Sequence, residues 1–121
     1  MNTYRVHVPA VKDSSLTATT VLGLVPCDRD AVLEKVLIAS RTGITHHGVN
    51  YSQIAIKNGT TLLASRVFNA SSLAAKTNEE LSIVANGSVD ETTCLNVEYD
   101  FAAAGLAIDL DVTLVFRLSR P

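Results

Sequence analysis

The stretch that decides the fold runs from residue 51 to residue 67 and reads YSQIAIKNGTTLLASRV. In its first half apolar and polar residues alternate, so that Ile54 and Ile56 share one face of an extended chain. Asn58-Gly59 follows directly, and these two residue types tolerate the positive φ angles of a type I′ turn. An extended pattern then resumes over Thr60–Val67. The stretch therefore predicts a β-hairpin.

The end of the chain repeats the period of two. From Ile108 to Leu118 every second residue is apolar, and the positions between them carry Asp109, Asp111, Thr113, Val115 and Arg117. We expect a strand over Leu106–Leu118 with the first set facing the core and the second set facing outward. The whole chain is rich in β-branched residues, with 14 valines, 6 isoleucines and 12 threonines, which favour strands over helices.

Turn signals divide the rest of the chain. Polar and glycine-containing clusters predict a loop over Arg41–Val49 and a turn at Asn86-Gly87, whereas helix-forming residues predict a short helical turn over Ser71–Ala75. Between these signals further strands are expected over Leu16–Val25, Glu80–Ala85 and Thr92–Phe101.

Residues 31–40 carry two conflicting signals. Asp30 could cap a helix that Gly43 would stop, and Leu33 and Val36 would then share one helical face. Against a helix, the segment contains several β-branched residues and follows a strand after only a short turn. Local signals favour a helix slightly, but consistency with the whole chain favours a strand, and we predict a strand.

The N-terminal segment 1–15 predicts a short strand followed by a turn. Tyr4, Val6 and Val8 alternate with polar residues, Pro9 removes a backbone donor, and residues 12–15 have turn chemistry. Such a segment could be an arm that pairs with a neighbouring subunit or an edge strand of its own sheet, and the sequence leaves both open. Residues 16–121 are expected to form a single domain, an all-β antiparallel sandwich of jelly-roll type with about seven or eight strands.

Composition excludes several classes of protein. The 121 residues fit one domain, and the net charge of −2 comes without any basic run, so we expect no nucleic-acid partner. The N-terminus shows no apolar signal-peptide core and no segment approaches the length of a transmembrane helix, so we expect no membrane partner. Cys27 and Cys94 do not make a disulfide framework, and each is expected to be a buried free thiol.

Three clusters of side chains are candidates for a chemical site. His46-His47 could hold a metal ion, but adjacent residues in an extended chain point in opposite directions and further ligands at motif spacing are missing. Asp109 and Asp111 share a strand face and could serve acid–base chemistry or Ca²⁺, although a solvated outer face explains them more simply. Asp28 and Asp30 flank Arg29 in a turn, where Asp is common.

No other pattern points to catalysis. The sequence contains none of the motifs GxSxG, HExxH or the P-loop, and we expect no catalytic residues, no metal and no cofactor. Four N-x-S/T patterns are interpreted as turns rather than glycan sites, because no signal peptide precedes them. They begin at Asn50, Asn58, Asn69 and Asn86.

From Leu16 to Leu118 the order of features resembles small jelly-roll structural proteins of tailed bacteriophages, namely capsid decoration (cement) proteins and head-fibre-base proteins. The similarity lies in a threonine-rich strand ending at Val25-Pro26, the segment 30–38 that reads DAVLEKVLI, the segment 51–59 that ends in Asn-Gly, and the late strands 94–99 and 112–118. It is a similarity of pattern and carries no functional residue over to this chain.

The resemblance implies a virion structural protein that is made in the bacterial cytoplasm and binds the outer surface of an assembled icosahedral head. It implies the major capsid protein as partner, a homotrimer as the oligomeric state, and no enzymatic activity. The alternative is a carbohydrate- or receptor-binding sandwich of a phage tail or fibre, for which Tyr4, Tyr51 and Tyr99 are the available tyrosines. An enzyme has no supporting constellation of residues.

Overall fold

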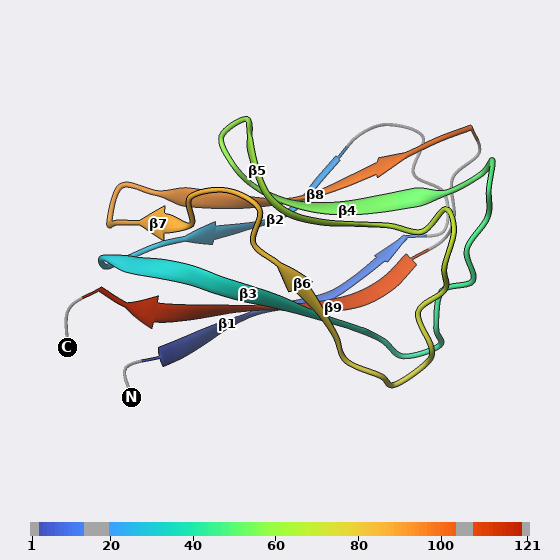
Figure 1. Cartoon of the computed structure of the whole chain (residues 1–121), viewed down its shortest axis with the longest axis horizontal. Coiled ribbons are helices and arrows are strands. Elements are labelled where there is room, and N and C mark those ends of the chain that lie inside the picture. Colours follow the sequence, from blue (N-terminus) through green and yellow to red (C-terminus); the bar gives the residue numbers. More distant parts are fainter. Residues whose placement is uncertain (1–2, 14–19, 104–107, 120–121) are drawn as a thin grey trace.

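The computed structural model describes residues 3–13, 20–103 and 108–119, which are all-β. Nine strands form two antiparallel sheets that pack as two layers (Figure 1). The strands are β1 (Thr3–Asp13), β2 (Thr20–Pro26), β3 (Ala31–Ser40), β4 (Ser52–Asn58), β5 (Thr61–Val67), β6 (Glu79–Ser82), β7 (Ser88–Val89), β8 (Cys94–Phe101) and β9 (Ile108–Leu118). This part of the chain has no helix long and apolar enough to cross a membrane.

The strand order is that of a jelly roll. One sheet has the order β1-β9-β3-β6, with β7 also paired to β3, and the other has the order β2-β8-β4-β5. Because β6 and β7 pair with successive parts of β3, they occupy one strand position between them. Every other connection except the β4–β5 hairpin crosses from one sheet to the other. The predicted antiparallel sandwich of jelly-roll type is confirmed.

Residues 31–40 form a strand, as predicted, and a β-bulge explains their helix-like spacing. In the pairing with β9, Leu33 lies opposite Phe116 and Lys35 lies opposite Val115, so Glu34 is an extra residue without a partner. The inward side chains are therefore Leu33 and Val36, three positions apart, although the strand is extended on both sides of the bulge. A spacing of three on one face is what made the segment resemble a helix.

The hairpin predicted over residues 51–67 is confirmed, and its two strands are β4 and β5. The predicted type I′ turn at Asn58-Gly59 is wrong in detail, because Asn58 ends β4 opposite Thr61 and the turn residues are Gly59 and Thr60. Of these two only Gly59 has a positive φ, of +62°, a conformation that favours glycine. Ser52, Ile54 and Ile56 are all fully buried on the inner face of the sheet.

The core lies between the sheets and consists almost wholly of apolar side chains. The largest buried side chains include Phe68, Phe116, Leu33, Ile54 and Leu114. On β9 the predicted inward set is buried at Leu110, Val112, Leu114 and Phe116. Val115 departs from the prediction, because it belongs to the outward set and is nevertheless only 5% exposed. Its partners in register are Arg5 of β1 and Lys35 of β3, so Val115 lies on an inner strand between two residues that have long side chains.

One polar pair is buried within this core. The hydroxyls of Ser52 and Tyr99 are hydrogen-bonded at 2.8 Å, and both residues are almost completely shielded from solvent. We predict that Tyr99→Phe lowers the free energy of unfolding by about 1–3 kcal/mol, because the Ser52 hydroxyl loses a partner inside the core. Urea titration monitored by circular dichroism measures this change. Tyr51→Phe is the control, since Tyr51 is only half-buried, and an equal loss in both variants would contradict the prediction.

Two local predictions are wrong. Ser71–Ala75 is not a helical turn, because Leu73 forms an antiparallel bridge with Ile44 and Ala75 a parallel bridge with Ser40. These long-range pairs outweigh the weak helix propensity of the segment. Residues 12 and 13 do not leave the first strand either, since β1 pairs with β9 as far as Asp13. A bulge between Val8 and Val11 accommodates Pro9 on this edge strand.

Other boundaries shift by a few residues. The strand predicted over Glu80–Ala85 ends at Ser82, and the strand predicted over Leu16–Val25 ends at Pro26 and is described from Thr20 onward. Residues 14–19 and 104–107 lie outside the described residues, as does the beginning of the predicted strand at Leu106. Segment 3–13, which the sequence left open between an arm and an edge strand, pairs with β9 of its own sheet.

Candidate functional site

The two candidate histidines lie in the exposed connection between β3 and β4. The Ser72 hydroxyl accepts a hydrogen bond from the His46 backbone N–H at 3.0 Å and lies 2.8 Å from His46 Nδ1. His47 Nδ1 accepts hydrogen bonds from the backbone N–H groups of Val49 at 3.0 Å and Asn50 at 2.7 Å. Both imidazoles therefore hold the loop in shape. Among the described residues no group of three or more His, Cys, Asp or Glu side chains is placed to hold a metal ion.

The carboxylates of β9 lie on the outer face of their sheet. His7 Nε2 lies 3.6 Å from the Asp111 carboxylate, and His7 Nδ1 lies 3.3 Å from the Thr113 hydroxyl. Asp109 is half-buried on the same face. His7 is a neighbour of Asp111 because β1 pairs with β9, and the sequence alone does not show this pairing.

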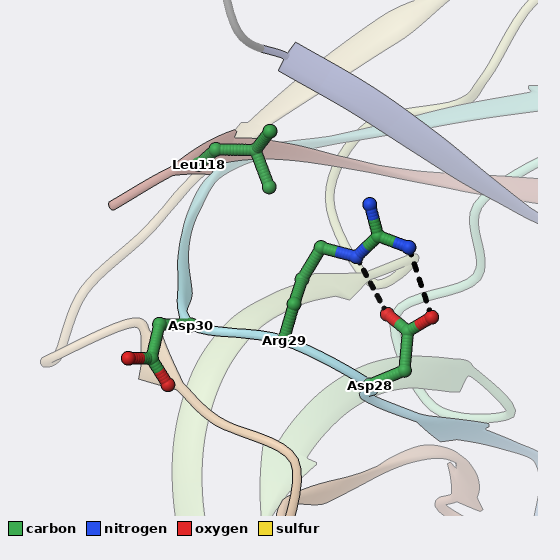
Figure 2. A pocket seen from close by; sticks show the side chains of 4 residues that line it. All are labelled: Asp28, Arg29, Asp30 and Leu118. Carbon is green, nitrogen blue, oxygen red and sulfur yellow. Dashed lines mark hydrogen bonds and ion pairs between the residues drawn. The ribbon is translucent and has the colours of Figure 1, made fainter. Parts of the chain in front are cut away.

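Asp28 and Asp30 line a shallow depression of about 370 Å³ together with Arg29 and Leu118 (Figure 2). The Arg29 guanidinium donates to both carboxylate oxygens of Asp28, at 2.8 and 3.0 Å, and this pairing lowers the pKa of Asp28. Arg29 also lies over the ring of Tyr4, 5.3 Å from its centroid. The arginine is therefore already paired with a carboxylate and a ring.

The two cysteines have different environments. Cys27 is buried and its thiol donates to the Val25 carbonyl oxygen at 3.7 Å, and burial raises the pKa of this thiol. Cys94 is also free but is exposed, so the prediction of a buried thiol is wrong there. The reason is register, because Cys94 lies opposite Pro26 and belongs to the outward-facing set of β8.

One end of the sandwich differs from these candidate sites because it lacks charged residues. It is made by residues 42–50 and 68–75, and we call it the charge-free end. The sequence has no Asp, Glu, Lys or Arg over residues 42–56 or over residues 67–75. Two connections that are far apart in sequence thus share one chemistry.

The two connections at this end are joined to each other by backbone hydrogen bonds. Ile44 and Leu73 exchange two backbone hydrogen bonds of 2.9 Å each, and both side chains are buried beneath the surface. Further along, the Lys76 N–H donates to the Ser40 carbonyl at 2.7 Å and the His47 N–H donates to the Phe68 carbonyl at 3.2 Å. The charge-free end is therefore a preorganised surface, which loses little conformational entropy on binding.

The opposite end of the sandwich has a different chemistry. Its turns carry Asp28, Arg29, Asp30, Asp90 and Glu91. The start of β1 and the finish of β9 also lie there, as Figure 1 shows from the positions of the two termini. Charged side chains are thus concentrated away from the charge-free end.

Sequence reasoning missed the charge-free end, although a signal for it was present. The gaps between charged residues are visible in the sequence, but each gap alone looks like an ordinary loop or strand. Only the strand order brings them to one end.

Comparison with known proteins finds likeness in structure alone. No family model matches the chain, and no characterised protein matches its sequence. A structure of infectious bursal disease virus, Gx strain, is 13% identical with a TM-score of 0.42 over 96% of this chain and 32% of that chain. The VP2 subviral particle of infectious bursal disease virus is 11% identical with a TM-score of 0.43 over 97% of this chain and 32% of that chain. The chain spans about a third of the length of each viral chain.

Proposed function

We propose that the chain is a virion structural protein, a decoration (cement) protein that binds the outer surface of an assembled icosahedral bacteriophage head and stabilises it. The observation that carries the proposal is the strand order, because the jelly roll is an architecture of viral capsid proteins. Its partner is the major capsid protein, and it acts as a homo-oligomer, expected to be a trimer. It is made in the host cytoplasm and catalyses no reaction.

The interior of the sandwich favours this role over the other uses of a jelly roll, which include lectins and cupins. The space between the sheets is filled by apolar side chains such as Phe68, Phe116 and Ile54, all fully buried. A binding partner therefore has to be met on the outer surface. A sugar would stack on exposed aromatic rings, but the rings of Tyr99, Phe68 and Phe116 are buried in the core.

Binding to heads tests the proposal. Heads from a virus with this gene deleted are mixed with the purified chain and sedimented, and the release of DNA on heating is followed. We expect saturable binding at a fixed number of copies per head, with an affinity of about 1 μM or tighter, and a higher temperature of DNA release. A chain that neither sediments with heads nor changes their heat stability would overturn the proposal. Binding to a glycan array without binding to heads would favour the carbohydrate-binding alternative instead.

A further inference from the structure

The charge-free end has the composition of the centre of a protein interface. Interface centres are depleted of charged residues, because burying a charge without a partner is costly, while charged residues remain at the rim. At this end the described surface residues are small or polar, as Thr45 and Ala74 are, with Val49 as an apolar residue that is 65% exposed. Charged residues appear only at the rim.

One corner of the rim is basic. Arg41 follows β3, and Lys76 lies beside it because the Lys76 N–H is bonded to the carbonyl of Ser40. Both side chains are exposed, and neither forms an ion pair with another described residue. By contrast, Lys35 and Lys57 are each within 3.6 Å of a glutamate. Lys76 also adopts a φ of +57°, which is uncommon for a side chain other than glycine and often marks a functional surface.

The diagonally opposite corner is acidic. Asp100 is exposed near the end of β8, which belongs to the other sheet and to its β2 side. Close by, Ala103 has a φ of +56°, so both positive-φ residues other than glycine in the described chain lie at this end. A surface with a neutral centre, one basic corner and one acidic corner can pair its basic corner with the acidic corner of a rotated copy. Head-to-tail contacts of this kind build a closed ring when the rotation between neighbours closes, and an open chain otherwise.

We propose that copies of this chain assemble through the charge-free end, with the Arg41–Lys76 corner of one copy against Asp100 of the next. The inference rests on the homo-oligomer of the proposed function and names its contact surface. The occupant of the surface is a second copy of the chain, because the same face supplies both the neutral centre and the two opposite charges. Its preorganised backbone suits a permanent contact.

The assembly is tested on the purified full chain without heads, by sedimentation velocity over a range of concentrations. Val49→Asp places a charge on the charge-free end, and Val84→Asp is the matched control, because Val84 is 68% exposed in the connection between β6 and β7. We expect the unchanged chain to form an oligomer and Val49→Asp to weaken its association at least tenfold. Val84→Asp should associate as the unchanged chain does.

Exchange of the rim charges tests the orientation. Arg41→Glu and Asp100→Lys should each weaken association, and the double variant should recover at least part of it. Circular dichroism and urea unfolding of each variant confirm that the fold is kept. A chain that stays monomeric throughout, or a Val49→Asp variant that associates normally, would overturn the inference. A monomer that still binds heads leaves the proposed function standing, whereas an oligomer that never binds heads leaves only the inference standing.

Discussion

Deletion of Leu37 should lower the free energy of unfolding by at least about 4 kcal/mol, whereas deletion of Glu34, three residues earlier in the same strand, should cost less than about 2 kcal/mol. The difference arises from the bulge in β3. Glu34 is the extra residue of that bulge, so its removal leaves a regular strand in which Leu33 and Val36 still face inward. Every pair with β9 is retained.

Removal of Leu37 cannot be absorbed in this way. If the residues before the gap move, Lys35 takes the place of Val36 opposite Leu114 and is brought into the core. If the residues after the gap move, Ile38 turns outward from a position where it is only 1% exposed. Burying an unpaired ammonium group or losing a buried isoleucine each costs several kcal/mol.

Urea unfolding of the two deletion variants measures the difference. Leu37→Ala is a control for the loss of the half-buried side chain itself, and it should cost less than the deletion. If the Glu34 deletion were as damaging as the Leu37 deletion, the bulge would not lie at Glu34 and the register of β3 would need revision.

Arg66→Ala should lower the free energy of unfolding by about 3 kcal/mol, because it breaks a largely buried ion pair that joins the two sheets. Arg66 lies on β5 with only 12% of its side chain exposed, and its Nε donates to Glu79 of β6 at 2.6 Å. Its Nη1 donates to the Val67 carbonyl at 2.7 Å, and the guanidinium lies 4.5 Å from the centroid of the Phe68 ring. The variant leaves the Glu79 carboxylate without this partner.

The matched control is Lys57→Ala, which removes the ion pair with Glu98 on the outer face of the same sheet. The Lys57–Glu98 distance is 3.4 Å, and the lysine side chain is 33% exposed against 12% for Arg66, although Glu98 is only 15% exposed. Because the pair has one longer contact to a solvated ammonium group, its loss should cost less than the loss of Arg66, about 1–2 kcal/mol. Arg66→Lys should fall between wild type and Arg66→Ala, since an ammonium group cannot reproduce the planar fork of donors. An Arg66→Ala variant within 1 kcal/mol of wild type in urea titration would show that the two sheet edges do not depend on this arginine.

The strands that the sequence predicted best are those with an uninterrupted period of two. Residues 51–57 and the last strand have that pattern, and both were found with the expected inner face. The N-terminal strand extended further than expected, because its pairing with β9 tolerates Pro9 through a bulge. Pairing between distant strands is a tertiary property, and local turn chemistry does not contain it.

The ambiguous and mistaken segments have physical reasons. The bulge at Glu34 produces a three-residue spacing that a strand pattern does not include. Leu73, Ala74 and Ala75 have helix propensity, but the bridges from Leu73 to Ile44 and from Ala75 to Ser40 keep them extended. The same topology explains why the candidate surface was missed, since its residues are neighbours only after the jelly roll has formed.

The measurement that tests the central claim most directly is a cryo-EM reconstruction of the virions that carry this chain. We predict density for the two-sheet jelly roll on the outer surface of the head, at positions repeated by the head symmetry, with the charge-free ends of neighbouring copies in contact. Density for the chain in a tail fibre alone, or a complete head whose outer surface carries no such domain, would contradict the assignment.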